Sequence, residues 1–506
     1  MFLQGPYAPA SEEISKECEV VGELPEAVCG EFARVGPNPR FAPTGGYHWF
    51  DGDGMVHGVR IKGGKATYTN RYVRTKMLAA EEETGEPVGL KFGDLASGLA
   101  IPTMLMYNLK TRLGLAQDWA GMNESTANTA LEFHAGRLMA LNEGGMPYAL
   151  RVMCDGMLET IGRVSFDGAL NGKFTAHPKK DPSSGKLYAF GYKLDTKPFL
   201  SFYVLDQNGK FERQIPIDLP RGVMMHDFAI TENYAVFLDL PMVVQPQNFL
   251  KGKVPIGFDN TQGARMGVLP LNATDSSNIR WFDMPDTFIA FHVLNAWEET
   301  VEVGGQDEAK PTTNAVVKVV TCDMFEFTLD LNALMQDVSP ASMPQPHTTV
   351  LNLDTGTASR TSVLPLPPTE GLDFPQIRRT LVGRKTRFGY CTAFDPAGFP
   401  TAVVKLDLQA ANPEEAMVGR IDFGDDLGGE CVFIPSTPNV SGEEEDDGFL
   451  ATFVSFRDGG NSELRVWDAK TMSAKPVATI KLPARVPLGF HALFVSEADL
   501  ATQLKE

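Results

Sequence analysis

The 506-residue chain is poor in cysteine and in basic residues, and it has no long apolar run. Its six cysteines are scattered and none belongs to a Cys-x-x-Cys motif, which argues against a disulfide scaffold and favours reduced thiols in a cytosolic protein. Only 45 basic residues stand against 64 acidic ones, a net charge of −19, so neither a nucleic-acid partner nor electrostatic docking on anionic lipid is expected. No apolar stretch is long enough to span a bilayer.

The signatures of several enzyme classes are also missing. The chain has no glycine-rich phosphate loop and no G-x-S-x-G motif. Residues 51–54 (DGDG) resemble the start of a calcium loop, but the later ligands are absent, and we predict a hairpin turn there. The first residues lack the basic and apolar segments of a signal peptide, and acids at Glu12, Glu13 and Glu17 are unlike a transit peptide. We therefore expect a cytoplasmic protein, which leaves peripheral contact with membranes open.

What the sequence does contain is a long series of short strands separated by tight turns. Strand-like residues 59–61 and 66–69 flank a Gly-Gly pair, and residues 201–205 and 211–215 flank Asn208-Gly209. The pattern runs from about residue 30 to 496 with no convincing linker, which predicts an array of β-sandwiches or a propeller. No clean repeat recurs, and the single Trp-Asp dipeptide does not support a WD40 propeller.

Two apolar stretches interrupt this series. Residues 94–116 carry leucines and methionines at helical spacing behind a capping Asp94, and residues 241–258 form a second apolar insertion. Both stretches either pack against the core or form an exposed apolar patch that dips into a membrane or guards a tunnel mouth. The acidic run at residues 443–447 is predicted to be a solvated loop.

Histidine is scarce, and four of the eight histidines lie in apolar or strand-like surroundings. A buried imidazole needs a polar partner, so each of these residues singly is best explained as a hydrogen-bonded core histidine. Together they could converge on a propeller axis and bind a metal ion, for which imidazole ligands allow iron, zinc, copper or nickel. The four residues are His177, His226, His292 and His491.

Three acidic residues in apolar surroundings extend this hypothesis. A histidine that binds a metal usually donates its second ring N–H to a carboxylate or a carbonyl. Glu143, Asp373 and Glu430 each adjoin an apolar segment and could accept such a bond, although each could instead be an exposed turn residue.

At these residues the chain resembles the carotenoid cleavage oxygenase family, and within it most closely the plant-type 9,10(9′,10′) carotenoid cleavage dioxygenases. The resemblance covers nearly the whole chain, with several long motifs in the same order. They are residues 30–39 (GEFARVGPNP), 46–55 (GYHWFDGDGM), 176–179 (AHPK), 225–234 (MHDFAITENY), 295–299 (NAWEE) and 486–491 (VPLGFH).

The resemblance implies an all-β, seven-bladed β-propeller that forms one domain over residues 1–506. It implies a helical and loop-rich dome over the metal face, to which the insertions at 94–116 and 241–258 would belong. It also implies a non-haem Fe(2+) held by His177, His226, His292 and His491. Three of these would be oriented by Glu143, Asp373 and Glu430. Asp373 is one methylene shorter than the glutamate of many family members, which implies a looser or water-mediated bond.

The activity implied is oxygen-dependent cleavage of a carotenoid or apocarotenoid C=C bond, at 9,10 and/or 9′,10′, to aldehyde or ketone apocarotenoids. The implied partners are the polyene, O₂ and a membrane surface contacted peripherally. One alternative is a stilbene-cleaving member of the family, but those enzymes carry a lysine where this chain has Asn142, with Tyr107 as the candidate tyrosine. The other is a non-catalytic propeller that serves as a binding scaffold, which would have no use for four histidines and three acids.

Overall fold

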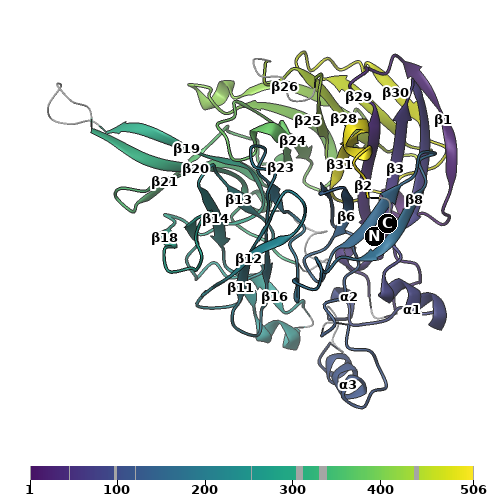
Figure 1. Ribbon diagram of the computed structural model, residues 1–506, viewed down its shortest axis with the longest axis horizontal. Coiled ribbons are helices and arrows are strands. Elements are labelled where there is room, and N and C mark those ends of the chain that lie inside the picture. Colours follow the sequence, from purple (N-terminus) through teal and green to yellow (C-terminus); the bar gives the residue numbers. More distant parts are fainter. Residues whose placement is uncertain are drawn as a thin grey trace.

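The computed structural model describes residues 2–44, 46–95, 100–119, 121–251, 253–303, 312–329, 339–437 and 444–504. This part of the chain folds mainly into antiparallel β-sheets with short helices between them, so the predicted all-β fold is confirmed. Figure 1 shows the sheets arranged around a common centre, as in a propeller. Among the described residues, no helix is both long and apolar enough to cross a bilayer.

Five sheets within the described ranges contain four strands each. Their strands are β5 (Ala130–His134), β6 (Arg137–Leu141), β7 (Tyr148–Val152), β8 (Leu158–Arg163), β9 (Lys179–Lys180), β10 (Leu187–Tyr192), β11 (Leu200–Leu205), β12 (Phe211–Ile217), β13 (Phe228–Ile230), β14 (Tyr234–Asp239), β17 (Arg265–Pro270), β18 (Arg280–Asp283), β19 (Ile289–Val303), β20 (Thr312–Met324), β21 (Gln345–Asn352), β22 (Ala358–Ser362), β23 (Gly371–Gln376), β24 (Phe388–Phe394), β25 (Pro400–Asp407) and β26 (Met417–Asp422). In each sheet the four strands follow one another along the sheet in chain order. The first strands of successive sheets are in contact, as β13 is with β19 and β19 with β23, so these strands line the centre.

The two ends of the chain meet in one nine-stranded sheet, on the right of Figure 1. Its strands, in spatial order, are β27 (Val432–Pro435), β28 (Gly448–Val454), β29 (Glu463–Asp468), β30 (Ala478–Lys481), β1 (Ser15–Gly22), β4 (Lys65–Tyr72), β3 (Gly54–Lys62), β2 (Gly30–Pro37) and β31 (Ala492–Ser496). Because β2 pairs with β31, with Arg34 opposite Ala492, the N-terminal and C-terminal segments close the ring together.

The predicted hairpin turns form where the sequence places them. Gly63 and Gly64 join β3 to β4 with φ angles of 59° and 74°, and Gly209 joins β11 to β12 with a φ of 80°. These left-handed conformations favour glycine because it has no Cβ. Between the sheets, the side chains form apolar clusters; one of them contains Phe202, Phe228 and Phe237, whose rings lie 5.4–6.4 Å apart.

The helices lie mostly at one side of the ring, at the bottom of Figure 1. They are α1 (Lys76–Thr84), α2 (Phe92–Leu95), α3 (Ala100–Arg112) and the C-terminal α4 (Glu497–Leu500), together with 3₁₀ turns at η1 (Gly5–Tyr7), η2 (Trp49–Asp51), η3 (Pro246–Lys251), η4 (Pro340–Ser342), η5 (Arg379–Leu381) and η6 (Pro413–Glu415). The predicted helix at 94–116 corresponds to the end of α2 and to α3, whereas residues 96–99 lie outside the described residues. The insertion at 241–258 contains η3 and a two-stranded sheet, β15 (Met242–Val244) and β16 (Ile256–Phe258).

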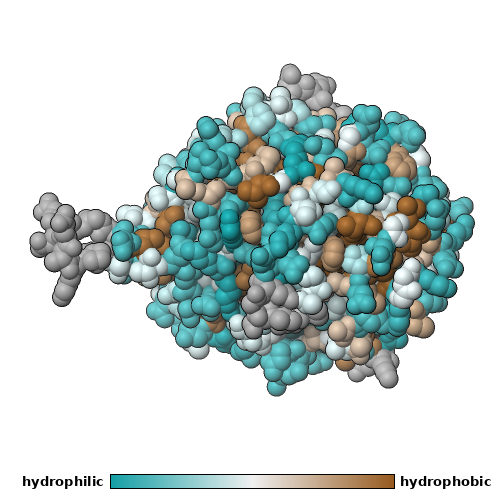
Figure 2. All heavy atoms as spheres, turned by 90° about the horizontal axis from the view of Figure 1, so that it is seen from above, coloured by the Kyte–Doolittle hydropathy of each residue, from teal (hydrophilic) through white to brown (hydrophobic). Residues whose placement is uncertain are grey.

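The leucines of α3 do not pack against the core. Leu105 and Leu109, and Leu113 directly after the helix, are 51–62% exposed, and α3 projects away from the sheets in Figure 1. Figure 2 shows the molecule from above, which is the side away from α3. On that face hydrophilic residues predominate and hydrophobic residues form only scattered spots. Of the two interpretations of this stretch, an exposed apolar patch therefore describes these leucines, and core packing is wrong for them.

Two local predictions are wrong. Residues 51–54 do not form a hairpin turn, because Asp51 ends a 3₁₀ turn and its carboxylate accepts hydrogen bonds from the backbone N–H groups of His48, Phe92 and Gly93. The acidic run is not fully solvated either. Glu443 lies outside the described residues, but Asp446 is buried and its carboxylate lies 2.6 Å from the buried Nζ of Lys405. In both cases a long-range partner overrides the local pattern.

Candidate metal centre

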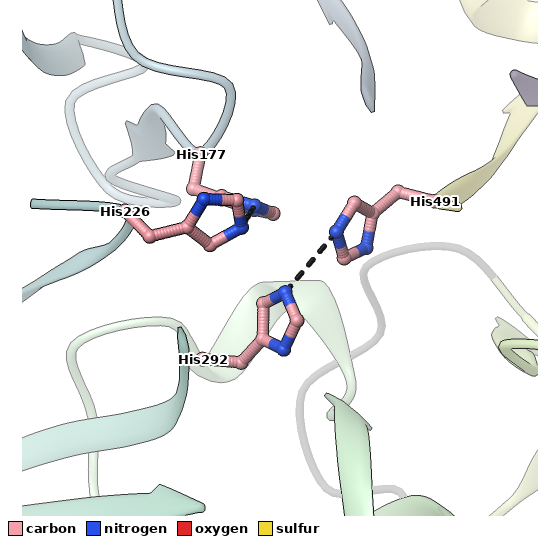
Figure 3. A group of neighbouring side chains, drawn as sticks. All are labelled: His177, His226, His292 and His491. Carbon is pink, nitrogen blue, oxygen red and sulfur yellow. Dashed lines mark hydrogen bonds between the residues drawn. The ribbon is translucent and has the colours of Figure 1, made fainter. Parts of the chain in front are cut away.

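Four histidines from different sheets meet at the centre of the ring (Figure 3). The histidine cluster consists of His177, His226, His292 and His491, whose ligand nitrogens all lie within 4.8 Å of one another. His177 and His226 precede β9 and β13, His292 lies in β19, and His491 precedes β31. The cluster forms because the first strands of several sheets, and the closing strand β31, all approach the same axis.

The ring nitrogens of the cluster point at one another at short range. Nε2 of His177 lies 2.9 Å from Nε2 of His226, and Nε2 of His292 lies 3.2 Å from Nε2 of His491. Burial and the three neighbouring imidazoles lower the pKa of His177 well below its usual value, and burial lowers the pKa of His491. Neutral imidazoles with inward nitrogens present lone pairs, which is the chemistry of a cation-binding set.

Three carboxylates hold the outer nitrogens of the cluster. Nδ1 of His292 lies 2.8 Å from Oδ1 of Asp373, and Nδ1 of His491 lies 3.0 Å from Oε1 of Glu430. Nδ1 of His226 lies 2.7 Å from Oε2 of Glu143. A carboxylate at Nδ1 keeps the proton there and leaves Nε2 free to act as a ligand. Burial acts to lower the pKa of His292, but the charge and hydrogen bond of Asp373, together with the charges of Asp227 and Glu430, outweigh it and the pKa is raised.

The carboxylates are themselves fixed in place. Glu430 accepts hydrogen bonds from the backbone N–H of Ala492 at 2.5 Å and from Nε2 of Gln376 at 2.9 Å. The hydroxyl of Tyr192 donates to Oε1 of Glu143 at 3.3 Å. These contacts limit the rotation of the acids and therefore of the imidazoles that they hold.

Asp373 does not make the looser or water-mediated bond that its shorter side chain implied, because its carboxylate contacts His292 directly. The strand β23 bulges between Asp373 and Gln376, and Phe374 adopts a left-handed φ of 51°. A bulge re-aims the side chains beside it, which compensates for the missing methylene.

Two cavities with different walls adjoin the cluster. The apolar cavity, of about 450 Å³, is lined mainly by aromatic and apolar residues such as Trp49, Phe291, Met324 and Phe374, and also by three acids: Glu326, Asp373 and Asp395. The polar cavity, of about 390 Å³, is lined by His177, His292, His491, Glu430 and several further charged residues. The two cavities share no lining residue.

Sequence reasoning missed the aromatic residues that border the cluster on the side of the apolar cavity. The ring of Phe374 lies 5.0 Å from that of His292 and 4.9 Å from that of His491, and the ring of Phe291 lies 5.2 Å from that of His226. The available signal was their position, since Phe291 directly precedes a cluster histidine and Phe374 directly follows Asp373.

Neither residue considered for phenol binding lies at the cluster. Tyr107 lies on α3, and its hydroxyl donates to the carbonyl of Gln117 at 2.8 Å. The amide of Asn142 donates to Oδ1 of Asn128 at 2.9 Å and to Oγ1 of Thr129 at 3.0 Å. Tyr107 and Asn142 are both absent from the walls of the two cavities.

Comparisons with known proteins agree with the resemblance seen in the sequence. A protein family described as "Retinal pigment epithelial membrane protein" matches residues 7–496. The carotenoid 9,10(9′,10′)-cleavage dioxygenase 1 of Phaseolus vulgaris is 42% identical over 517 residues, which cover 100% of this chain and 91% of that protein. The protein of the same name from Arabidopsis thaliana is 42% identical over 515 residues, covering 99% of this chain and 91% of that one.

Solved structures give the same fold. The lignostilbene dioxygenase of Pseudomonas brassicacearum superposes with a TM-score of 0.80 at 27% identity and covers 98% of both chains. A variant of the apocarotenoid oxygenase of Synechocystis superposes with a TM-score of 0.77 at 23% identity, covering 97% of this chain and 98% of that one.

Proposed function

The chain belongs to the family of the retinal pigment epithelial membrane protein and the carotenoid cleavage oxygenases, and on this premise we propose that it is an Fe(2+)-dependent carotenoid cleavage dioxygenase. The reaction is cleavage of a carotenoid or apocarotenoid C=C bond by O₂, at 9,10 and/or 9′,10′, to aldehyde or ketone apocarotenoids. The observation that carries this proposal is the histidine cluster with its three carboxylates beside an aromatic-walled cavity.

The metal would be held by His177, His226, His292 and His491. The donor set fits an iron ion, since neutral imidazoles bind Fe(2+) and leave coordination positions free. When bound, iron supplies the activation of O₂ that neither zinc nor the side chains can supply. Glu143, Asp373 and Glu430 keep the Nδ1 protons of three ligands outward, so that each Nε2 lone pair faces the metal.

The protein's part in the reaction is to place one bond of a long apolar substrate beside the cluster. The apolar cavity reaches exposed residues at Glu326 and at 396–398, so one end of it opens to the surface. Phe291 and Phe374 stand between this cavity and the cluster, where their rings can contact a polyene. No protein nucleophile or general base is needed, and the position of cleavage follows from how the substrate is seated.

We also propose that the ring has seven blades and that residues 1–506 form one domain. The nine-stranded sheet then counts as two blades, β27 to β30 and the set β1, β4, β3, β2 and β31, joined edge to edge at β1 and β30. The first set has four strands, like each of the five separate sheets, and the second set has five. The insertions at 94–116 and 241–258 belong to a dome over the metal face, and β16 and α2 share an apolar cluster that includes Phe92, Ile256 and Phe258.

The exposed apolar residues of α3 support peripheral contact with a membrane. Three residues of the helix and two that follow it are 51–73% exposed: Leu105, Met106, Leu109, Leu113 and Leu115. Apolar side chains of this kind bind the lipid interface without a basic surface, which agrees with the net charge of −19. We place the protein in the cytoplasm, in contact with membranes through α3; the six cysteines, all unpaired, suit a reducing compartment.

The test is product analysis together with iron content. The purified chain is incubated with β-carotene, an apocarotenal and resveratrol, and the carbonyl products are identified. We expect apocarotenoid products, loss of iron and activity in His226→Ala, and retention of both in the matched control His347→Ala, since His347 lies on β21 and outside the cluster. Cleavage of resveratrol alone would favour a stilbene substrate, and iron retained by His226→Ala would refute the metal centre.

A further inference from the structure

The polar cavity is separate from the apolar cavity to which we assign the polyene, and three of the cluster histidines line it. Its walls run from the buried Glu430 and His491 to the exposed Pro182 and Asp499, so it connects the cluster with the surface. The cavity therefore offers a second way to the cluster, separate from the apolar one.

One segment bridges the outer part of this cavity. The strap, residues 378–385, includes η5, connects β23 to β24 and supplies Arg379, Thr380 and Val382 to the cavity wall. Nη2 of Arg379 donates to both carboxylate oxygens of Glu132, at 2.7 and 2.6 Å. Glu132 lies on β5, whose sheet contacts the closing strands β2 and β31, so this ion pair joins two sheets that are not neighbours in the ring.

Further contacts tie the strap to three more sheets. Arg384 lies 2.8 Å from Asp181, which follows β9, and 2.9 Å from Glu232, in the turn between β13 and β14. The buried amide of Asn295, on β19, donates to the carbonyls of Leu381 and Arg384 and accepts from the N–H of Gly383. The strap is therefore held across the end of the axis by side chains from around the ring.

We propose that the polar cavity is the route by which the metal ion reaches and leaves the histidine cluster, and that the strap limits the rate of this exchange. This inference rests on the proposed metal centre. A hydrated divalent cation loses its water at great cost in an aromatic-walled cavity. The polar cavity instead exposes three of the cluster histidines themselves, and the carboxylates of Asp499, Glu132, Asp227 and Glu430 lie along its walls. Lys179 and Lys180 line it as well, and Lys179 pairs with Asp227 at 2.7 Å. At the wall of this cavity the side chain of Arg379, from the strap, pairs with that of Glu132.

The experiment measures the kinetics of ferrous iron exchange. Apoprotein is prepared with a chelator, Fe(2+) is added without oxygen, and its uptake and its loss to a chromogenic chelator are followed. Arg379→Met removes the ion pair to Glu132, and Glu132→Gln weakens the same contact from the other wall while preserving its shape. Arg387→Met is the matched control, because Arg387 makes a similar contact from an exposed arginine to a buried carboxylate, that of Asp407, outside both cavities.

We expect Arg379→Met to accelerate uptake and loss several-fold, with the affinity for iron unchanged. Glu132→Gln should accelerate both to a smaller extent, because it frees the strap but also removes one of the carboxylates along the route. Arg387→Met should match the wild type. In the other cavity, Ala397→Trp should raise the KM for the polyene and leave iron exchange unaffected, because exposed Ala397 lines only the apolar cavity.

Equal exchange rates in the two strap variants and the control would overturn the route, as would slower iron uptake in Ala397→Trp. Should Arg379→Met fail to fold, as judged by its melting curve, Glu132→Gln carries the test alone. A wild-type chain that binds no iron would refute the metal centre itself. If iron binds but its exchange rates are the same in the wild type and the strap variants, only the proposed route is refuted.

Discussion

Glu430→Gln is the substitution whose effect on the metal centre follows most directly from the structure. The carboxylate of Glu430 accepts from Nδ1 of His491 through Oε1, at 3.0 Å, and from the N–H of Ala492 through Oε2, at 2.5 Å. An amide has only one oxygen. Whichever way the new amide is turned, either His491 or Ala492 then faces an N–H donor instead of an acceptor.

The magnitude follows from the loss of one buried hydrogen bond to a charged group. Such a bond contributes about 1.5–3 kcal/mol, and a buried donor without an acceptor costs about 1–3 kcal/mol. If the amide nitrogen takes the place of Oε1, both His491 and Gln376 lose their acceptor. If it takes the place of Oε2, it faces the N–H of Ala492, and His491 keeps only an uncharged acceptor. In both orientations the imidazole of His491 is held less firmly with Nε2 toward the cluster. We therefore expect the affinity for Fe(2+) to fall about 10–100-fold, the range found when an outer partner of a metal ligand is replaced.

The assay is an anaerobic titration of apoprotein with Fe(2+) in competition with a chelator, together with thermal melting. Glu81→Gln is the matched control, because Glu81 is a buried carboxylate that lies 2.8 Å from Lys91 and has no contact with the cluster. Both variants should melt at lower temperature, but only Glu430→Gln should bind iron more weakly. Iron affinity within about two-fold of wild type in Glu430→Gln, against the 10–100-fold expected, would refute the positioning role of this carboxylate.

Three further predictions address the metal, the cavity and the membrane. Fe(2+) at about 100 times its dissociation constant should stabilise the fold by about 2.7 kcal/mol, which raises the melting temperature by about 2.5 °C for a chain of this length; calorimetry that shows no shift would contradict a metal bound to the folded state alone. Phe374→Ala removes the ring beside His292 and His491, and should raise the KM for the polyene in a steady-state assay without changing iron content. The control is Phe394→Ala, since the ring of Phe394 lies 5.8 Å from that of Phe374 and has no such contact with the cluster; its effect on KM should be smaller. Leu105→Glu with Leu109→Glu replaces two exposed leucines and should weaken binding to vesicles by about ten-fold or more in a sedimentation assay, because transferring each leucine from water contributes about 1.5–3 kcal/mol when fully buried; binding equal to that of the wild type would exclude α3 as the contact.

Some of the structure could be derived from neighbouring residues alone. The Gly63-Gly64 and Asn208-Gly209 turns form as predicted, because a tight hairpin needs a positive φ and glycine provides it locally. The cluster histidines could be nominated for the same kind of reason, since an imidazole among apolar neighbours needs a polar partner or a metal. What these neighbours could not reveal was which partner each histidine has.

Other features depended on contacts that local sequence does not encode. Asp446 stands in a run of acids that is typical of a solvated loop, yet it is buried against Lys405. The leucines of α3 have the spacing of a packed helix, yet they are exposed, and α3 projects away from the sheets in Figure 1. Asp373 contacts His292 directly in spite of its short side chain, beside a bulge in β23 that the local sequence did not predict.

The sequence by itself determined the all-β pattern, the glycine turns at Gly63-Gly64 and Asn208-Gly209, the excess of acidic residues and the short list of residues able to bind a metal, since these follow from side-chain chemistry and local backbone preference. The tertiary structure decided that His177, His226, His292 and His491, spread over more than half of the chain, share one centre. It also decided that an apolar and a polar cavity adjoin that centre and that the strap crosses the axis. The physical reason is ring closure. Pairing of β2 with β31 fixes how the sheets pack around the axis, and only that packing sets the distances between side chains that are far apart in sequence.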